Sequence, residues 1–180
     1  MSIVLVGSTS GSITLQEPAV SGSTVLSLPA VTGTILTTTS PKAGNVIQVV
    51  SGVRSATTST TSLSFVTTNL TASITPSSSS NKILIIVGLG DCSASNTPTN
   101  GGITVQLQRN GSAVGANFYN QLSYQDPVSY SIVGGAFTYL DSPASTSSLA
   151  YTVFFKSQGS TVECFRDGSQ GSIILMEIAA

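Results

Sequence analysis

The sequence predicts an all-β protein in which an N-terminal stem of short-strand repeats, residues 1–44, precedes an antiparallel β-sandwich or jelly roll, residues 45–180. Runs rich in Val, Ile and Thr alternate with clusters of Gly, Pro, Asn and Ser, as strands alternate with turns. No stretch has a useful helical period, and good helix formers are sparse. The length of 180 residues suits one domain with an appendage.

The predicted stem is defined by an eleven-residue repeat. Glycines recur at this spacing, at Gly11, Gly22, Gly33 and Gly44. The period fits a short strand followed by a Gly/Pro turn, which predicts strands at 12–16, 23–28 and 34–38. Such a unit is too small to form its own core, so we expect it to pack on copies in other chains. The residues expected at these contacts are Ile13, Leu15, Val20, Val25, Leu26, Leu28, Val31, Ile35 and Leu36.

Two segments flank the repeats. Residues 3–6 form a short apolar run, which suits either a buried strand or a docking arm. Residues 37–44 are predicted to be a linker, because they combine Thr and Ser with Pro41 and Gly44.

Longer strands are predicted in the body. Asn110-Gly111 is typical of a type I′ turn, so 103–109 and 113–118 should pair as a hairpin. The expected strands are 45–53, 61–66, 69–76, 82–90, 103–109, 128–140, 148–157, 160–165 and 171–179.

Two of these runs do not alternate between apolar and polar residues. Residues 83–87 and 173–176 are apolar throughout, whereas 103–109 alternates as a strand with one wet face requires. The two apolar runs should be covered on both sides. This indicates either the middle of a sandwich or a subunit interface.

Charge and length exclude some partners. Charged residues make up 7% of the chain, against about 25% in ordinary soluble domains. The six basic residues are scattered, so no nucleic-acid partner is expected. No apolar run is long enough for membrane insertion, and no signal peptide is recognised, so synthesis and assembly in the cytoplasm are expected.

No enzyme, metal or cofactor site is predicted. The chain has no His, and its carboxylates are isolated except for Glu163 and Asp167, which Arg166 would pair with locally. Asp91 and Asp126 are the remaining, weaker candidates for a calcium site. Cys92 and Cys164 are expected to be small buried thiols, and a disulfide requires that their strands be neighbours.

One segment has the composition of a recognition loop. Amides and aromatics stack on and hydrogen-bond to sugars or receptor loops, although loops over a jelly roll and aromatics at a trimer axis look the same. The candidate receptor-binding residues are Asn117, Tyr119, Asn120, Gln121, Tyr124, Gln125 and Asp126.

The stem resembles a segment common in tail-fibre and other fibre-like structural proteins of bacteriophages, especially cyanophages and marine phages. The similarity covers about residues 10–39, with Gly-Ser-Ile-Thr-Leu-Gln from Gly11 and Leu-Pro-Ala-Val-Thr-Gly-Thr-Ile-Leu from Leu28. The body is similar, more loosely, to the C1q/TNF-like jelly-roll heads of such fibres. That similarity is in residues 74–78, 82–85, 108–115 and 172–178.

The resemblance implies a homotrimeric virion protein, either a tail fibre or a capsid fibre, with an anchoring stem and an exposed head for host attachment. Its partners would be other capsid or tail proteins and a host-surface glycan or protein receptor. One alternative is a capsid decoration protein that stabilises the phage head. Another, of a different class, is a free carbohydrate-binding module, which should be monomeric.

Overall fold

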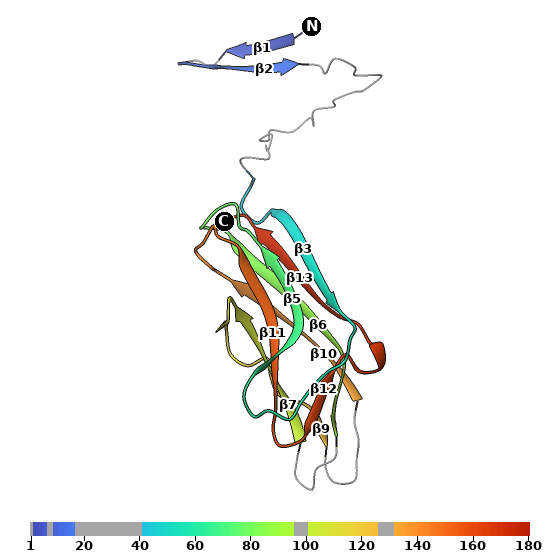
Figure 1. The fold of residues 1–180 in the computed structure, drawn as a ribbon. Coiled ribbons are helices and arrows are strands. Elements are labelled where there is room, and N and C mark those ends of the chain that lie inside the picture. The colour runs from blue at the N-terminus through green and yellow to red at the C-terminus, as the bar shows by residue number, and fades with distance from the viewer. Residues whose placement is uncertain (1, 7–8, 17–40, 96–100, 126–131) are drawn as a thin grey trace. The chain divides into compact units, whose positions relative to one another are not determined.

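The computed structural model describes residues 2–6, 9–16, 41–95, 101–125 and 132–180. Within these ranges the protein is all-β with antiparallel pairing and no α-helix, and a single 3₁₀ turn, η1 (Arg166–Gly168), lies near the C-terminus. The chain divides into two compact units, Met1–Ile35 and Leu36–Ala180. Figure 1 shows the strands of both units.

The first unit contains a two-stranded antiparallel sheet. Strand β1 (Ser2–Val6) pairs with β2 (Ser12–Gln16), so the strand expected at 12–16 is confirmed. Within the predicted apolar run, the side chains of Val4 and Val6 are 53% and 80% exposed.

The rest of the predicted stem lies largely outside the described residues. Ile13 and Leu15 are in β2, where their backbones pair with Leu5 and Ile3 of β1. The strands expected at 23–28 and 34–38 are outside the described residues, as are the remaining predicted stem contacts, Val20, Val25, Leu26, Leu28, Val31, Ile35 and Leu36.

The second unit is a β-sandwich whose first sheet is organised around β6. One edge of β6 pairs with β10, and the other edge pairs with β13. Strand β12 pairs with the same edge as β13, further along β6. Strand β3 pairs with the free edge of β13, and β4 pairs with the free edge of β12. The bounds are β3 (Val46–Arg54), β4 (Thr58–Thr60), β6 (Lys82–Ser95), β10 (Ile132–Asp141), β12 (Thr161–Cys164) and β13 (Gly171–Ile178).

The second sheet has the order β5-β11-β7, and both β8 and β9 pair with β7. The turn at Asn110 and Gly111 has positive φ at both residues, 50° and 82°, which confirms the predicted hairpin turn. The bounds are β5 (Val66–Ile74), β7 (Gly101–Arg109), β8 (Ser112–Ala113), β9 (Tyr119–Gln125) and β11 (Leu149–Ser157).

The core lies between the two sheets. Strands β5, β11 and β13 show regular alternation, in which every second side chain is buried. Fully burying one such aliphatic or aromatic side chain stabilises the fold by roughly 1.5–3 kcal/mol. The largest fully buried apolar side chains are Leu70, Ile83, Ile85, Leu89, Ile103, Leu107, Tyr151, Phe155, Phe165, Ile173 and Leu175.

The structure corrects three strand predictions. Residues 61–65 of the strand expected at 61–66 are not strand, because the Ser62 hydroxyl makes local hydrogen bonds to the backbone of Ser64, and the strands here are β4 before them and β5 from Val66. The hairpin partner expected at 113–118 is only two residues of strand, because Gly115 has φ +73° and turns the chain away. Pairing with β7 resumes in β9, which the sequence did not predict.

Gly52 of β3 lies where the edges of the two sheets approach each other. A Cβ at this position would be 2.0 Å from the backbone carbonyl oxygen of Thr71 in β5, a group that cannot rotate away. We expect Gly52→Ala to lower the free energy of unfolding by about 2–3 kcal/mol, as overpacking does. Chemical denaturation measures this loss. Gly134→Ala is the matched control, because a Cβ there would meet nothing closer than 3.6 Å, and equal losses in both variants would contradict the prediction.

Candidate functional site

The outward side of the first sheet carries a continuous set of apolar side chains from four neighbouring strands. Register places Val49 of β3 beside Met176 of β13, Met176 beside Leu84 of β6, and Leu84 beside Leu140 of β10. Figure 1 shows these strands side by side. We call this set the apolar face: Val46, Val49, Val53, Leu84, Ile86, Ala136, Leu140, Ile174, Met176 and Ile178.

Solvent reaches much of the apolar face in the single chain. Val49 is 57% exposed, Val53 64% and Leu140 50%. The positions interspersed among these side chains are mostly small and uncharged, such as Ser51, Thr138 and Ser172, and one charged residue, Lys82, lies beside Ile178 at one end of the face. A contiguous exposed apolar surface of this kind marks an interaction site, whereas scattered single apolar residues do not.

The outward side of the second sheet has the opposite character. Its register rows combine Thr71, Thr152 and Gln108, and then Thr67, Phe154 and Gln106. Mostly polar side chains therefore cover this side, as expected for an antiparallel sheet that faces water. The outward side of the first sheet, unlike that of the second sheet, is therefore an apolar surface that has no partner among the described residues.

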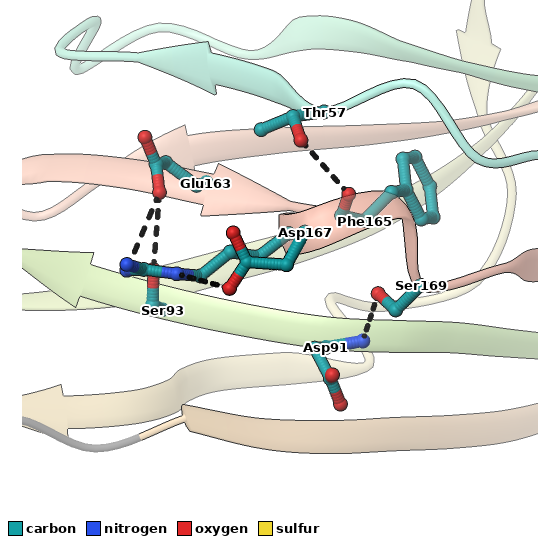
Figure 2. A network of polar contacts seen from close by, with 8 residues as sticks. Thr57, Asp91, Ser93, Glu163, Phe165, Asp167 and Ser169 are labelled. Carbon is teal, nitrogen blue, oxygen red and sulfur yellow. Dashed lines mark hydrogen bonds and ion pairs between the residues drawn. The ribbon is translucent and has the colours of Figure 1, made fainter.

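A polar cluster lies at the β12 end of the first sheet (Figure 2). Arg166 pairs with Glu163 at 3.7 Å and with Asp167 at 3.2 Å, and Ser93 Oγ donates a hydrogen bond to Glu163. The local ion pair predicted for Arg166 is therefore confirmed. Because these groups are partly exposed, each pair contributes at most about 1 kcal/mol.

The polar cluster adjoins the bend between β12 and β13. Ser169 Oγ accepts a hydrogen bond from the Asp91 backbone N–H at 2.9 Å, and Thr57 Oγ1 donates to the Phe165 carbonyl at 3.0 Å, as Figure 2 shows. Phe165 has φ 58°, which is rare for an aromatic residue, but its ring is fully buried. These contacts indicate that the polar cluster stabilises the bend between β12 and β13.

Among the described residues of the body, the most buried charged side chain is that of Glu177 on β13, whose role the sequence did not predict. Its side chain is fully buried, and its carboxylate accepts hydrogen bonds from Gln48, Asn81 and both the backbone N–H and hydroxyl of Ser77. Burial alone would raise the pKa of Glu177, but these hydrogen bonds together leave it below its ordinary value. The network joins β3, the 75–81 turn and β13.

A cavity of about 460 Å³ adjoins this network. Ser77 and Asn81 line the cavity, and both direct donors to Glu177. The other lining residues are Pro41, Ile47, Ser78, Ala179 and Ala180. The side chains that line this cavity are therefore all uncharged.

A second buried carboxylate, Asp141 at the end of β10, contacts the second sheet. It pairs with Arg109 at 2.5 Å and accepts a hydrogen bond from the Tyr151 hydroxyl at 2.6 Å. Burial and the neighbouring carboxylate raise the pKa of Tyr151 above its ordinary value, so the phenol stays protonated and donates. The contact therefore joins the two sheets.

The candidate receptor-binding residues do not form the loop that the sequence predicted. Tyr119–Gln125 is strand β9, which the mixture of amides and aromatics concealed, and it contains Asn120, Gln121, Tyr124 and Gln125. Asn117 is exposed before the strand and accepts a hydrogen bond from Gln106. Asp126 lies outside the described residues.

The hydroxyl of Tyr119 is hydrogen-bonded within the fold. Its phenol oxygen accepts from the Ala136 N–H at 3.0 Å and donates to the Ala136 carbonyl at 2.6 Å, which links β9 to β10 across the two sheets. Phe118 stacks on Phe137 at 4.0 Å between ring centroids and meets Tyr139 edge-on. These aromatic contacts account for the partly buried rings at this edge of the sandwich.

Among the described residues, no three His, Cys, Asp or Glu side chains are grouped so that they could hold a metal ion. In those same ranges, no helix has the length and apolar character needed to cross a membrane. A comparison with protein-family models gives no match, and a comparison with curated protein sequences gives none either.

Proposed function

We propose that this chain is a non-enzymatic structural protein of a bacteriophage particle, a homotrimeric tail or capsid fibre whose stem anchors it and whose head is exposed. The observation that carries the proposal is the apolar face, which spans four strands of the first sheet. The resemblance of the repeat stem to phage fibre segments is the reason for assigning the chain to a bacteriophage particle.

The strand order of the body supports a jelly roll of the C1q/TNF type. The first sheet has the central order β3-β13-β6-β10, and the second has β5-β11-β7-β9. The chain passes from one sheet to the other after β4, β5, β6, β9, β10 and β11. Most neighbouring strands within a sheet are therefore distant in sequence, and the hairpin of β7 and β8 is an exception. Two four-strand layers connected in this way are typical of jelly rolls.

A second copy of this chain is the partner that we propose for the apolar face. Uncharged side chains give little electrostatic discrimination, so the surface fits a like surface as well as a foreign one. Cyclic association of three copies would remove all three faces from water and close the assembly. The repeats of the stem also require neighbouring copies, so both units favour the same kind of partner.

The remaining surface suits exposure on a particle. Charged residues are only 7% of the chain, and Thr, Ser and Gln dominate the outward side of the second sheet. Such a surface changes little with salt, because it has few charges to screen. In the assembled fibre we place the second sheet outward, toward the medium and the host-surface glycan or protein.

The mass of the purified full chain in solution tests the proposal. Light scattering at micromolar concentration should give about three times the chain mass of 18.3 kDa. A stable monomer would contradict the fibre and would favour a free carbohydrate-binding module. Labelling this chain on imaged particles then separates a tail fibre from a capsid fibre or a capsid decoration protein, and absence from the particle would refute all three.

A further inference from the structure

Cys92 and Cys164 lie opposite each other in the interior of the body. They are register partners in the antiparallel pairing of β6 with β12, and both side chains are fully buried. Their sulfurs are 3.1 Å apart, and both are free thiols in the structure, with Cys92 donating to Cys164. The neighbours on the same side of the sheet, Ala94 and Val162, are buried as well.

This placement satisfies the geometric requirement for a disulfide. Directly opposed residues of an antiparallel pair have Cα atoms about 4.5–5.5 Å apart, whichever kind of pair they form. Disulfides span Cα separations of about 4.4–6.8 Å. The strands would therefore not have to move apart or slide for the two sulfurs to bond.

We propose that Cys92 and Cys164 are a disulfide site that forms one intramolecular bond between β6 and β12 in oxidising surroundings. In a reducing cytoplasm the two thiols stay free. The proposal does not depend on the phage assignment, because it uses only the pairing and burial of these two residues.

The oxidant would be a small disulfide such as oxidised glutathione. The thiolate of one cysteine attacks it, which forms a mixed disulfide and releases one glutathione thiolate. The thiolate of the second cysteine then displaces the other glutathione and forms the protein disulfide. Overall, the two cysteines lose two protons and two electrons, and oxidised glutathione gains them to become two molecules of the reduced form.

The folded state should oxidise slowly. Only the thiolate attacks, and both sulfurs are shielded from solvent. The hydrogen bond with Cys92, together with burial, raises the pKa of the Cys164 thiol well above its ordinary value. We therefore expect the bond to form during folding or local opening, before β12 docks fully on β6.

The bond would link cysteines 72 positions apart in sequence. A link of this span restricts the unfolded chain strongly, and it would attach the β12 segment to the central strand of the first sheet. The oxidised protein should therefore unfold at a temperature at least about 5 °C higher than the reduced protein.

The test is to unfold the full chain, refold it in a buffer of reduced and oxidised glutathione, and then alkylate free thiols under denaturing conditions. Intact mass should be lower than that of the reduced chain by two hydrogen atoms, with no alkylation. A non-reducing digest should contain the Cys92–Cys164 peptide pair, and a reductant should remove the gain in unfolding temperature. Folded reduced protein in the same buffer should react much more slowly.

Cys92→Ala and Cys164→Ala are the controls, because each leaves one thiol that can form a glutathione adduct or a bond to a second chain but cannot form the intramolecular bond. Two alkylated thiols, adducts on both cysteines, or bonds between chains in the refolded wild-type protein would overturn the proposal. Chain exported to an oxidising compartment of a host cell gives a second route to the same mass measurement if refolding yields little protein.

Discussion

Val49→Asp is expected to convert the proposed trimer into folded monomers. Val49 lies in the row of four apolar side chains that crosses the apolar face, and it is 57% exposed in the single chain. Asp at this position is therefore hydrated in the monomer. In an assembly built on this face the carboxylate would be buried without a partner, at a cost of several kcal/mol per chain.

Light scattering measures the mass of the Val49→Asp variant, and circular dichroism checks that the β-structure is retained. We expect the mass to fall from about three chains to one at micromolar concentration. Leu140→Asp, at the other end of the same row and 50% exposed, should have the same effect. Agreement between two strands at opposite edges would place the interface across the whole sheet.

Ser73→Asp is the matched control, because Ser73 is exposed on β5 of the second sheet and the same carboxylate is introduced. We expect this variant to keep the mass of the wild-type assembly. If Val49→Asp and Leu140→Asp also keep it, the apolar face is not the subunit interface. If Ser73→Asp alone dissociates the assembly, the interface is on the second sheet.

The sequence predicted the strands of the body better than it predicted their environment. The apolar runs 83–87 and 173–176 were expected to be covered on two sides, by a sandwich or by a subunit. In the structure their alternate residues face the core, whereas Leu84, Ile86, Ile174 and Met176 face outward. The pattern identified the unusual strands, but only the pairing register shows that their outward residues form one surface.

The contacts that join distant segments could not be predicted from the sequence. Strand β9 was interpreted as a recognition loop because Asn, Gln and Tyr have weak or mixed strand signals. Cys92 and Cys164 were identified as a pair that requires neighbouring strands, and the structure supplies that pairing. Glu177 was described as isolated because its partners are about 100 or more positions away in sequence.

Replacing Glu177 should strongly destabilise the folded chain. The fully buried carboxylate accepts hydrogen bonds at 2.5–2.8 Å from Gln48, Ser77 and Asn81. Glu177→Ala would leave these donors without an acceptor and would create a small cavity. We expect a loss of about 3–5 kcal/mol in the free energy of unfolding, measured by chemical denaturation.

Glu177→Gln removes the charge of the side chain but keeps its shape, so it separates their effects on stability. Gln keeps one acceptor oxygen but directs an NH₂ group at neighbouring donors, so we expect a loss of about 2 kcal/mol. Glu163→Gln is the matched control, because Glu163 is partly exposed and its ion pair with Arg166 is worth at most about 1 kcal/mol. The chain concentration must be held fixed, since assembly makes apparent stability depend on concentration.

The pH dependence distinguishes a stabilising charge from simple packing. The folded pKa of Glu177 lies below the ordinary value of 4.5, so the unfolded chain binds the proton more readily. The stabilisation is therefore complete above the unfolded pKa and is lost as the pH falls through the folded pKa. Wild-type protein should thus lose more stability than Glu177→Gln when acidified below 4.5. Equal losses in the two proteins would mean that the pKa of Glu177 is the same in the folded and the unfolded chain, so that its charge adds no net stability.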